Sequence, residues 1–108
     1  MGRLDDRVAI VTGGGRGIGQ ATSLRLAADG ASVVVNDIDD APANETVALI
    51  EAAGGKAIAC VANTVEMAQA ERLVQTAVDT YGKIDIIVNN AGVTRALQII
   101  HKELDLSM

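Results

Sequence analysis

The chain has 108 residues and a formal net charge of −5 at pH 7; 49% of its residues are hydrophobic, yet only one is aromatic. This length predicts one domain, residues 1–108, with an aliphatic core such as a buried parallel sheet. The acidic balance argues against a nucleic acid or an anionic membrane surface as partner, and no apolar run approaches the ~20 residues of a membrane span. The first residues lack the apolar stretch of a secretion signal, and the single cysteine excludes an internal disulfide. We therefore expect a cytoplasmic protein.

Short β-branched apolar runs alternate along the chain with segments of helical periodicity. The predicted strands cover residues 7–12, 31–37, 56–62 and 83–90, and the first two predicted helices cover residues 17–29 and 40–53. A third helical face runs through Met67, Ala70, Val74, Ala77 and Tyr81. Residues 91–108 are ambiguous and fit a loop followed by the first turns of another helix.

Two local patterns refine the helices. The first helix carries an apolar stripe formed by Ile18, Ala21, Leu24 and Ala28. Before the third helix, Asn63 is followed three residues later by Glu66, a spacing that predicts a capping box. We therefore expect the stripe to pack on the sheet and Asn63 to begin the third helix.

Strands that alternate with helices of this length predict a doubly wound, parallel α/β sheet of the Rossmann-like type. The expected strand order is 3-2-1-4, the amino-terminal half of such a fold. Ligands bind such sheets beyond the carboxyl ends of the strands, at the switch point between strands 1 and 4. Glycine-bearing stretches follow both of these strands, at residues 12–19 and 89–92.

The stretch VTGGGRGIGQ, residues 11–20, spaces its glycines as Gly13-x-x-x-Gly17-x-Gly19 rather than as G-x-G-x-x-G. Gly13 suits a tight turn after the strand, Gly17 lets the backbone approach a phosphate, and Gly19 lets the helix pack closely on the sheet. The N–H groups that begin the helix, with the helix dipole behind them, offer an anion site. The alternative is a glycine-rich turn that binds no ligand.

TGGGRGIG, residues 12–19, resembles the T-G-x-x-x-G-x-G motif of the short-chain dehydrogenase/reductase family, and NNAG, residues 89–92, matches that family's second motif. NNAGVTR is similar to the 3-oxoacyl-acyl-carrier-protein reductase group. The resemblance implies a nicotinamide cofactor and hydride transfer between a carbonyl and an alcohol. It implies pyrophosphate contacts near the glycine loop, and a place for Asn90 near the ribose, where it also braces the sheet. The predicted cofactor-binding residues are Gly13, Gly15, Arg16, Gly17, Ile18, Gly19, Asp37, Asn63, Asn90, Ala91 and Gly92.

The choice between NAD and NADP depends on two residues. Asp37 lies 18 residues after Gly19, near the spacing expected of the carboxylate that accepts from the adenosine ribose and repels a 2′-phosphate. Arg16 favours NADP, because a cation in this loop reaches a 2′-phosphate in relatives. We give Asp37 more weight and predict NAD, although the acyl-carrier reductases mostly use NADPH. The alternative for Asp37 is a solvated turn acid like Asp39 and Asp40.

One position departs from the family. Relatives usually carry Asp-Val after the third strand, where the Asp contacts the adenine amino group, and this chain carries Asn63-Thr64. The amide oxygen of Asn63 can accept the same hydrogen bond without charge, or Asn63 can serve only as a helix N-cap.

The family's catalytic tyrosine, with a lysine four residues later, has no counterpart in the chain. The only tyrosine, Tyr81, is followed four residues later by Asp85, and we expect it to lie at a helix end in the core. Ser107 lies too early to be the family's serine, His101 reads as a solvated side chain, and Cys60 as a small buried hydrophobe. We therefore predict no catalytic or metal-binding residue, and expect a fragment, a truncated product or a partly resolved protein that is inactive alone.

Two further functions remain open at this point. The chain could be a non-catalytic nucleotide-binding or interaction module with the same fold. It could also be a methyltransferase, which uses a glycine loop and an acidic residue after strand 2, although NNAG and the glycine spacing argue against this. The full-length protein would act on a small carbonyl or alcohol substrate and form homo-oligomers. An unpaired edge of strand 4 predicts that the chain alone self-associates through this strand or is poorly stable.

Overall fold

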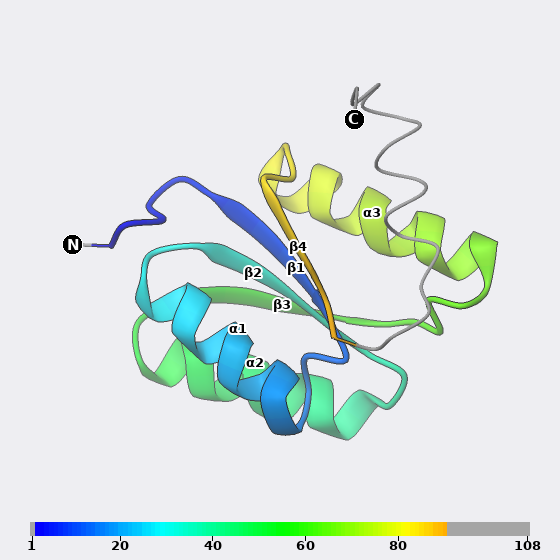
Figure 1. The fold of residues 1–108 in the computed structure, drawn as a ribbon, viewed down its shortest axis with the longest axis horizontal. Coiled ribbons are helices and arrows are strands. Elements are labelled where there is room, and N and C mark those ends of the chain that lie inside the picture. Colours follow the sequence, from blue (N-terminus) through cyan, green and yellow to red (C-terminus); the bar gives the residue numbers. More distant parts are fainter. Residues whose placement is uncertain (1, 91–108) are drawn as a thin grey trace.

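The computed structural model describes residues 2–90, in which strands and helices alternate (Figure 1). The elements are β1 (Val8–Thr12), α1 (Gly17–Ala28), β2 (Ser32–Asp37), α2 (Asp40–Ala52), β3 (Lys56–Val61), α3 (Met67–Tyr81) and β4 (Ile86–Asn89). Each strand and helix expected within this range is confirmed, and β4 begins three residues later than predicted. No helix among the described residues is both long and apolar enough to cross a membrane.

The four strands form one parallel sheet in the order β3-β2-β1-β4, which confirms the predicted order. In the register, Val11 of β1 lies opposite Val35 of β2 on one side and Val88 of β4 on the other. The glycine loop and Asn90, the residue after β4, therefore lie side by side at the carboxyl edge of the sheet.

Helices cover both faces of the sheet, with α1 and α2 on one face and α3 on the other (Figure 1). Alternate residues of each strand point to opposite faces. Val11 and Val35 therefore pack under α1 and α2, whereas Ile10 and Val34 pack with Leu73 of α3. Burial of each such side chain contributes roughly 1.5–3 kcal/mol to the free energy of folding.

The predicted apolar stripe of α1 faces the core only at Leu24. Ile18 is 78% exposed, and the buried residues of the helix are Gly19, Ser23 and Ala27. The reason is the short distance between α1 and the end of β1, since a Cβ on Gly19 would lie 1.9 Å from the carbonyl oxygen of Gly13. Small side chains permit this approach. Of the predicted stripe, Ile18, Ala21 and Ala28 are exposed, and only Leu24 packs against the core, where it is half-buried.

The predicted capping box before α3 is also wrong. Glu66 is itself the N-cap residue, and it makes no side-chain cap hydrogen bond. The side-chain oxygen of Asn63 instead accepts the N–H of Val65 at 3.1 Å, in a local turn, and Gln69 Oε1 accepts the N–H of Asn63 at 2.7 Å. Asn63 therefore lies outside the helix, at the carboxyl edge of the sheet.

The core-facing side of α3 is largely as expected. Ala70, Val74 and Ala77 are buried, Tyr81 is half-buried at the end of the helix, and Met67 is 45% exposed. Burial raises the pKa of the Tyr81 phenol, with a smaller contribution from the charge of Glu51. The interpretation of Tyr81 as a helix-end core residue is confirmed.

The edge strand β4 is less deeply buried than the centre of the sheet. Every residue of β1 is buried, whereas Ile86, Ile87 and Val88 are half-buried. Among the described residues no strand pairs with the outer side of β4. Self-association through this edge stays a prediction.

Asp85 joins the start of β4 to the start of β1. Its Oδ2 accepts the N–H of Val8 at 2.9 Å and lies 3.1 Å from Lys83 Nζ, and its Oδ1 lies 3.6 Å from Arg7 Nη1. The hydrogen bond from Val8 is the main cause that lowers the pKa of the Asp85 carboxyl, and the two cations lower it further. Asp85 therefore stabilises the fold in its ionised form.

Ile10→Ala should lower the free energy of unfolding by about 2–5 kcal/mol, because Ile10 is fully buried and truncation leaves a cavity. The same truncation at Ile18 is the matched control and should change it by less than about 0.5 kcal/mol. Urea unfolding followed by circular dichroism measures both. An equal loss of unfolding free energy in the two variants would contradict the exposed position of Ile18.

Asp85→Asn should lower stability at neutral pH, and the difference from wild type should shrink as the pH falls. The folded pKa lies below the ordinary 3.8, so the ionised carboxyl contributes fully above about pH 4 and loses its contribution as the pH passes the lowered pKa. Urea unfolding between about pH 3 and pH 6 measures this. Asp79→Asn, an exposed residue of α3, should keep the wild-type profile; an undiminished Asp85→Asn difference at the lowest pH would contradict the linkage.

Candidate functional site

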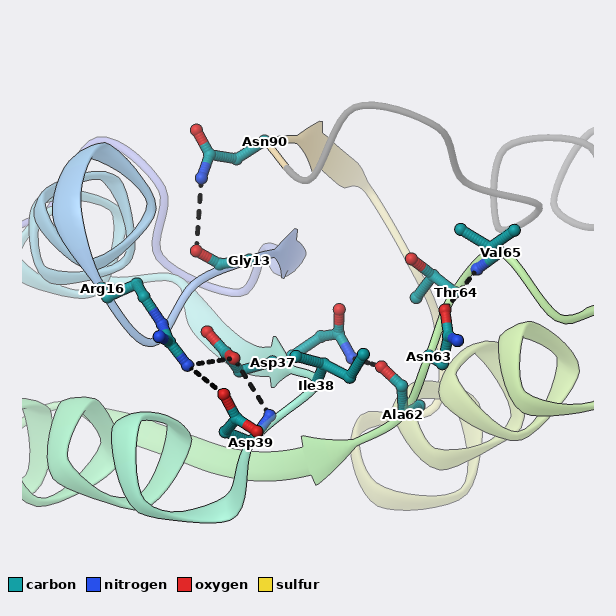
Figure 2. A pocket seen from close by; sticks show the side chains of 11 residues that line it. Gly13, Arg16, Asp37, Ile38, Asp39, Ala62, Asn63, Thr64, Val65 and Asn90 are labelled. Carbon is teal, nitrogen blue, oxygen red and sulfur yellow. Dashed lines mark hydrogen bonds and ion pairs between the residues drawn. The ribbon is translucent and has the colours of Figure 1, made fainter.

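A cavity of about 400 Å³ lies at the carboxyl edge of the sheet. It falls within the range of roughly 300–1,000 Å³ that is usual for small-molecule sites. Figure 2 shows the side chains that line it, which come from the ends of all four strands and the loops that follow them. The structure brings together five of the predicted site residues along this lining: Gly13, Arg16, Asp37, Asn63 and Asn90.

A second cavity of similar size, about 420 Å³, lies at the opposite edge of the sheet. Its lining includes Ser32 and Lys56, the first residues of β2 and β3, together with Asp5 and Asp6. It has neither the glycine loop nor a helix N-terminus. The cavity at the carboxyl edge is therefore the candidate site.

The glycine loop is held against the ends of β2 and β4. Gly14 donates its N–H to the carbonyl of Asn36 at 2.6 Å, and Gly15 donates its N–H to Asp37 Oδ2 at 3.2 Å. On the other side, Asn90 Nδ2 donates to the carbonyl of Gly13 at 3.2 Å. These bonds fix the path of the backbone between β1 and α1.

The N-terminus of α1 begins directly after this loop. Gly17, Ile18 and Gly19 form its first turn, Arg16 is the N-cap, and no side chain caps the helix. The first N–H groups of an α-helix have no partner within the helix and carry the positive end of its dipole. The arrangement can hold an anion there.

Asp37, the last residue of β2, is buried, with 3% of its surface exposed. Its Oδ2 accepts the N–H of Gly15, and its Oδ1 accepts the N–H of Asp39 at 3.1 Å and lies 3.2 Å from Arg16 Nη2. The alternative that Asp37 is a solvated turn acid is wrong. Its carboxylate is a fixed part of the cavity wall.

Arg16 lies between two carboxylates (Figure 2). Its Nη2 is 2.5 Å from Asp39 Oδ2, in addition to the contact with Asp37. The hydrogen bond with Asp39 raises the pKa of the Arg16 guanidinium most, followed by the interactions with Asp37. The sequence analysis missed Asp39, since nothing in the run of acids around it indicates which one the cation contacts.

Two exposed apolar side chains at the cavity were also not predicted from the sequence. Ile38 is 61% exposed and Val65 is 51% exposed, and both line the cavity. Large exposed aliphatic residues at a cavity provide apolar surface for a flat ring. Their position after a buried strand and before a helix was the available signal.

The remaining sequence predictions fall into two groups. Cys60 is buried, as expected, with 4% of its surface exposed. Ala91, Gly92, His101 and Ser107 lie outside the described residues. Among residues 2–90 no group of three or more His, Cys, Asp or Glu side chains could hold a metal ion.

The family model described as short chain dehydrogenase matches residues 7–106. The chain belongs to the short-chain dehydrogenase family. This membership agrees with the resemblance of the two glycine motifs and removes the methyltransferase alternative.

Individual relatives support the same conclusion. The chain is 44% identical over 106 residues to a 3-oxoacyl-[acyl-carrier-protein] reductase of Synechocystis sp., covering 97% of this chain and 43% of the relative. It is 45% identical over 91 residues to the short-chain dehydrogenase/reductase homolog YusS of Bacillus subtilis, covering 83% of this chain and 84% of the relative. A solved 7 alpha-hydroxysteroid dehydrogenase, complexed with NADH and 7-oxo glycochenodeoxycholic acid, superposes with a TM-score of 0.79 at 42% identity, covering 81% of this chain and 34% of that one.

The chain corresponds to only part of the length of its relatives. It spans 43%, 38% and 38% of the length of the first three curated relatives that it matches, in each case less than half.

Proposed function

We propose that the chain forms the dinucleotide-binding part of an NAD-dependent oxidoreductase. The parent reaction is hydride transfer between the nicotinamide and a carbonyl or alcohol substrate. The observation that carries the proposal is the buried Asp37 carboxylate, fixed beside the glycine loop at the carboxyl edge of the sheet. Members of the family bind NAD(H) or NADP(H), and one solved relative holds NADH.

The residues of the cavity fit the parts of a dinucleotide. The helix start at Gly17, Ile18 and Gly19, with Gly13 and Gly15 in the preceding loop, offers N–H groups to the pyrophosphate. Asp37 accepts from the ribose hydroxyls. Asn63 serves the adenine edge, while the apolar surfaces of Ile38 and Val65 suit the faces of the base. Asn90 serves the ribose, as the resemblance implies, while Ala91 and Gly92 of the same motif lie outside the described residues and stay predictions.

Two charges support NAD over NADP. The Asp37 carboxylate lies 4% exposed in a wall of the cavity, where a 2′-phosphate would be brought next to a charge that water screens poorly. Arg16, the residue that argued for NADP, is already paired with two carboxylates.

The catalytic step requires residues that the 108-residue sequence does not supply. A general acid–base pair of tyrosine and lysine four residues apart is absent from it, since the only tyrosine is followed at that spacing by Asp85. We therefore propose that the chain alone binds cofactor without turnover. We propose that the whole protein acts on a small carbonyl or alcohol substrate and forms a homo-oligomer. Its cytoplasmic location stays a prediction.

Asp37→Ala should weaken NAD binding and reduce the preference for NAD over NADP, because it removes both the ribose acceptor and the charge that repels the 2′-phosphate. Isothermal titration of the chain with each nucleotide measures the ratio of the dissociation constants. Asp40→Ala is the control, since Asp40 bonds only to Asn44 of its own helix among the described residues. Circular dichroism verifies that both variants fold.

An unchanged ratio in a folded Asp37→Ala variant would contradict the assignment of Asp37. Absence of binding of either nucleotide to the wild-type chain would contradict the proposed function itself.

A further inference from the structure

Arg16 pairs with Asp39 as well as with Asp37, although one carboxylate is enough to balance its charge. Both ion pairs use the same nitrogen, Nη2, at 3.2 Å from Asp37 Oδ1 and 2.5 Å from Asp39 Oδ2. The side chains of Arg16 and Asp39 are 58% and 61% exposed, whereas that of Asp37 is 4% exposed. The cluster therefore has a buried acid, a cation at the cavity and an outer acid (Figure 2).

The formal charge of this cluster depends on Asp39. Arg16 and Asp37 together are neutral, and Asp39 makes the cluster −1. Asp37 is also held by N–H groups of Gly15 and Asp39, so its carboxylate cannot turn away from the cavity without breaking these bonds. Asp39, whose carboxylate pairs only with Arg16 among the described residues, can change without breaking these bonds.

We propose that Asp39 is a specificity-determining residue that keeps Arg16 from serving as a 2′-phosphate receptor. The inference rests on the proposed function, in which the cavity takes the adenosine end of a dinucleotide. With Asp39 in place, Nη2 of the guanidinium is held by two carboxylates and the cluster is net negative. A 2′-phosphate, which carries about −1.5 to −2 charges, meets repulsion instead of a cation.

The pairing of Arg16 with Asp39 matters because a free arginine in this loop could bind a phosphate. A guanidinium is the side chain best suited to bind a phosphate through two parallel hydrogen bonds. Arg16 stands in the glycine loop, lines the cavity, and remains more than half exposed. Removal of the outer acid would leave Arg16 a single carboxylate partner and a neutral cluster, so the loop would bind the phosphorylated nucleotide more tightly than before, while Asp37 would still disfavour it.

The neighbouring acid Asp40 provides a matched control. It carries the same charge one residue further along, but its side chain bonds to Asn44 rather than to Arg16. If the nucleotide preference depends on contact with Arg16, substitution of Asp39 should change it and substitution of Asp40 should not. If it depends only on overall charge, both substitutions should change it equally. Asp39 is exposed and Asn is a favoured N-cap residue, so Asp39→Asn should fold.

The experiment is isothermal titration of the 108-residue chain with NAD and with NADP, which differ only in the 2′-phosphate. Asp39→Asn should raise NADP affinity relative to NAD by about tenfold, and Asp40→Asn should shift the ratio far less. Adding Arg16→Gln to Asp39→Asn should abolish the gain. Because the cluster is largely exposed, high salt should reduce it.

An unchanged ratio in Asp39→Asn, an equal shift in Asp40→Asn, or a gain that survives Arg16→Gln would overturn the role of Asp39 while NAD binding persisted. Loss of all NAD and NADP binding in the wild-type chain would instead overturn the proposed function, and this inference with it. The two failures are therefore distinguished in the same titration.

Discussion

The buried carboxylate of Asp37 connects the parts of the molecule that form the candidate site. It ends β2, accepts an N–H from the glycine loop and another from Asp39, the N-cap residue of α2, and pairs with Arg16. A carboxylate removed from water is costly unless such partners satisfy it. The position of the loop, the start of α2 and the direction of the Arg16 side chain are thus coupled through one group.

The close approach of α1 to the sheet is the complementary constraint. Gly19 lies so near the Gly13 carbonyl that no side chain fits between them, and Asn90 donates to the same carbonyl from the end of β4. Glycine in the loop is therefore required by packing as well as suited to a phosphate. A ligand at the helix N-terminus would meet a backbone already fixed from both sides.

Most of the fold could be predicted from the sequence, because the apolar runs and glycine boundaries repeat with the period of a βαβ unit. The errors arose where local patterns competed with packing. The stripe through Ile18 has helical periodicity, yet the close approach to Gly13 admits only glycine at position 19, and the buried face of the helix continues through Ser23 and Ala27. Asn63 and Glu66 have the spacing of a capping box, but Asn63 forms its own turn with Val65.

The site was predicted in its residue types and missed in its pairings. Asp37 was recognised from its spacing after Gly19 and Arg16 from its place in the glycine loop, but whether Asp37 was buried or solvated depended on the loop folding back over it. The contact of Arg16 with Asp39 joins residues 23 positions apart through exposed side chains, and sequence periodicity carries no information about such a pair. Ile38 and Val65 likewise become neighbours of one cavity only when β2 and β3 end at the same edge.

The central claim is that a dinucleotide binds at the carboxyl edge of the sheet. Its most direct test is an amide NMR titration of the isotope-labelled chain with NAD. The account predicts shifts concentrated in residues 13–19 and at Asp37, with residues 54–56 at the opposite cavity unchanged. Shifts centred on residues 54–56, or none at saturating NAD, would contradict it.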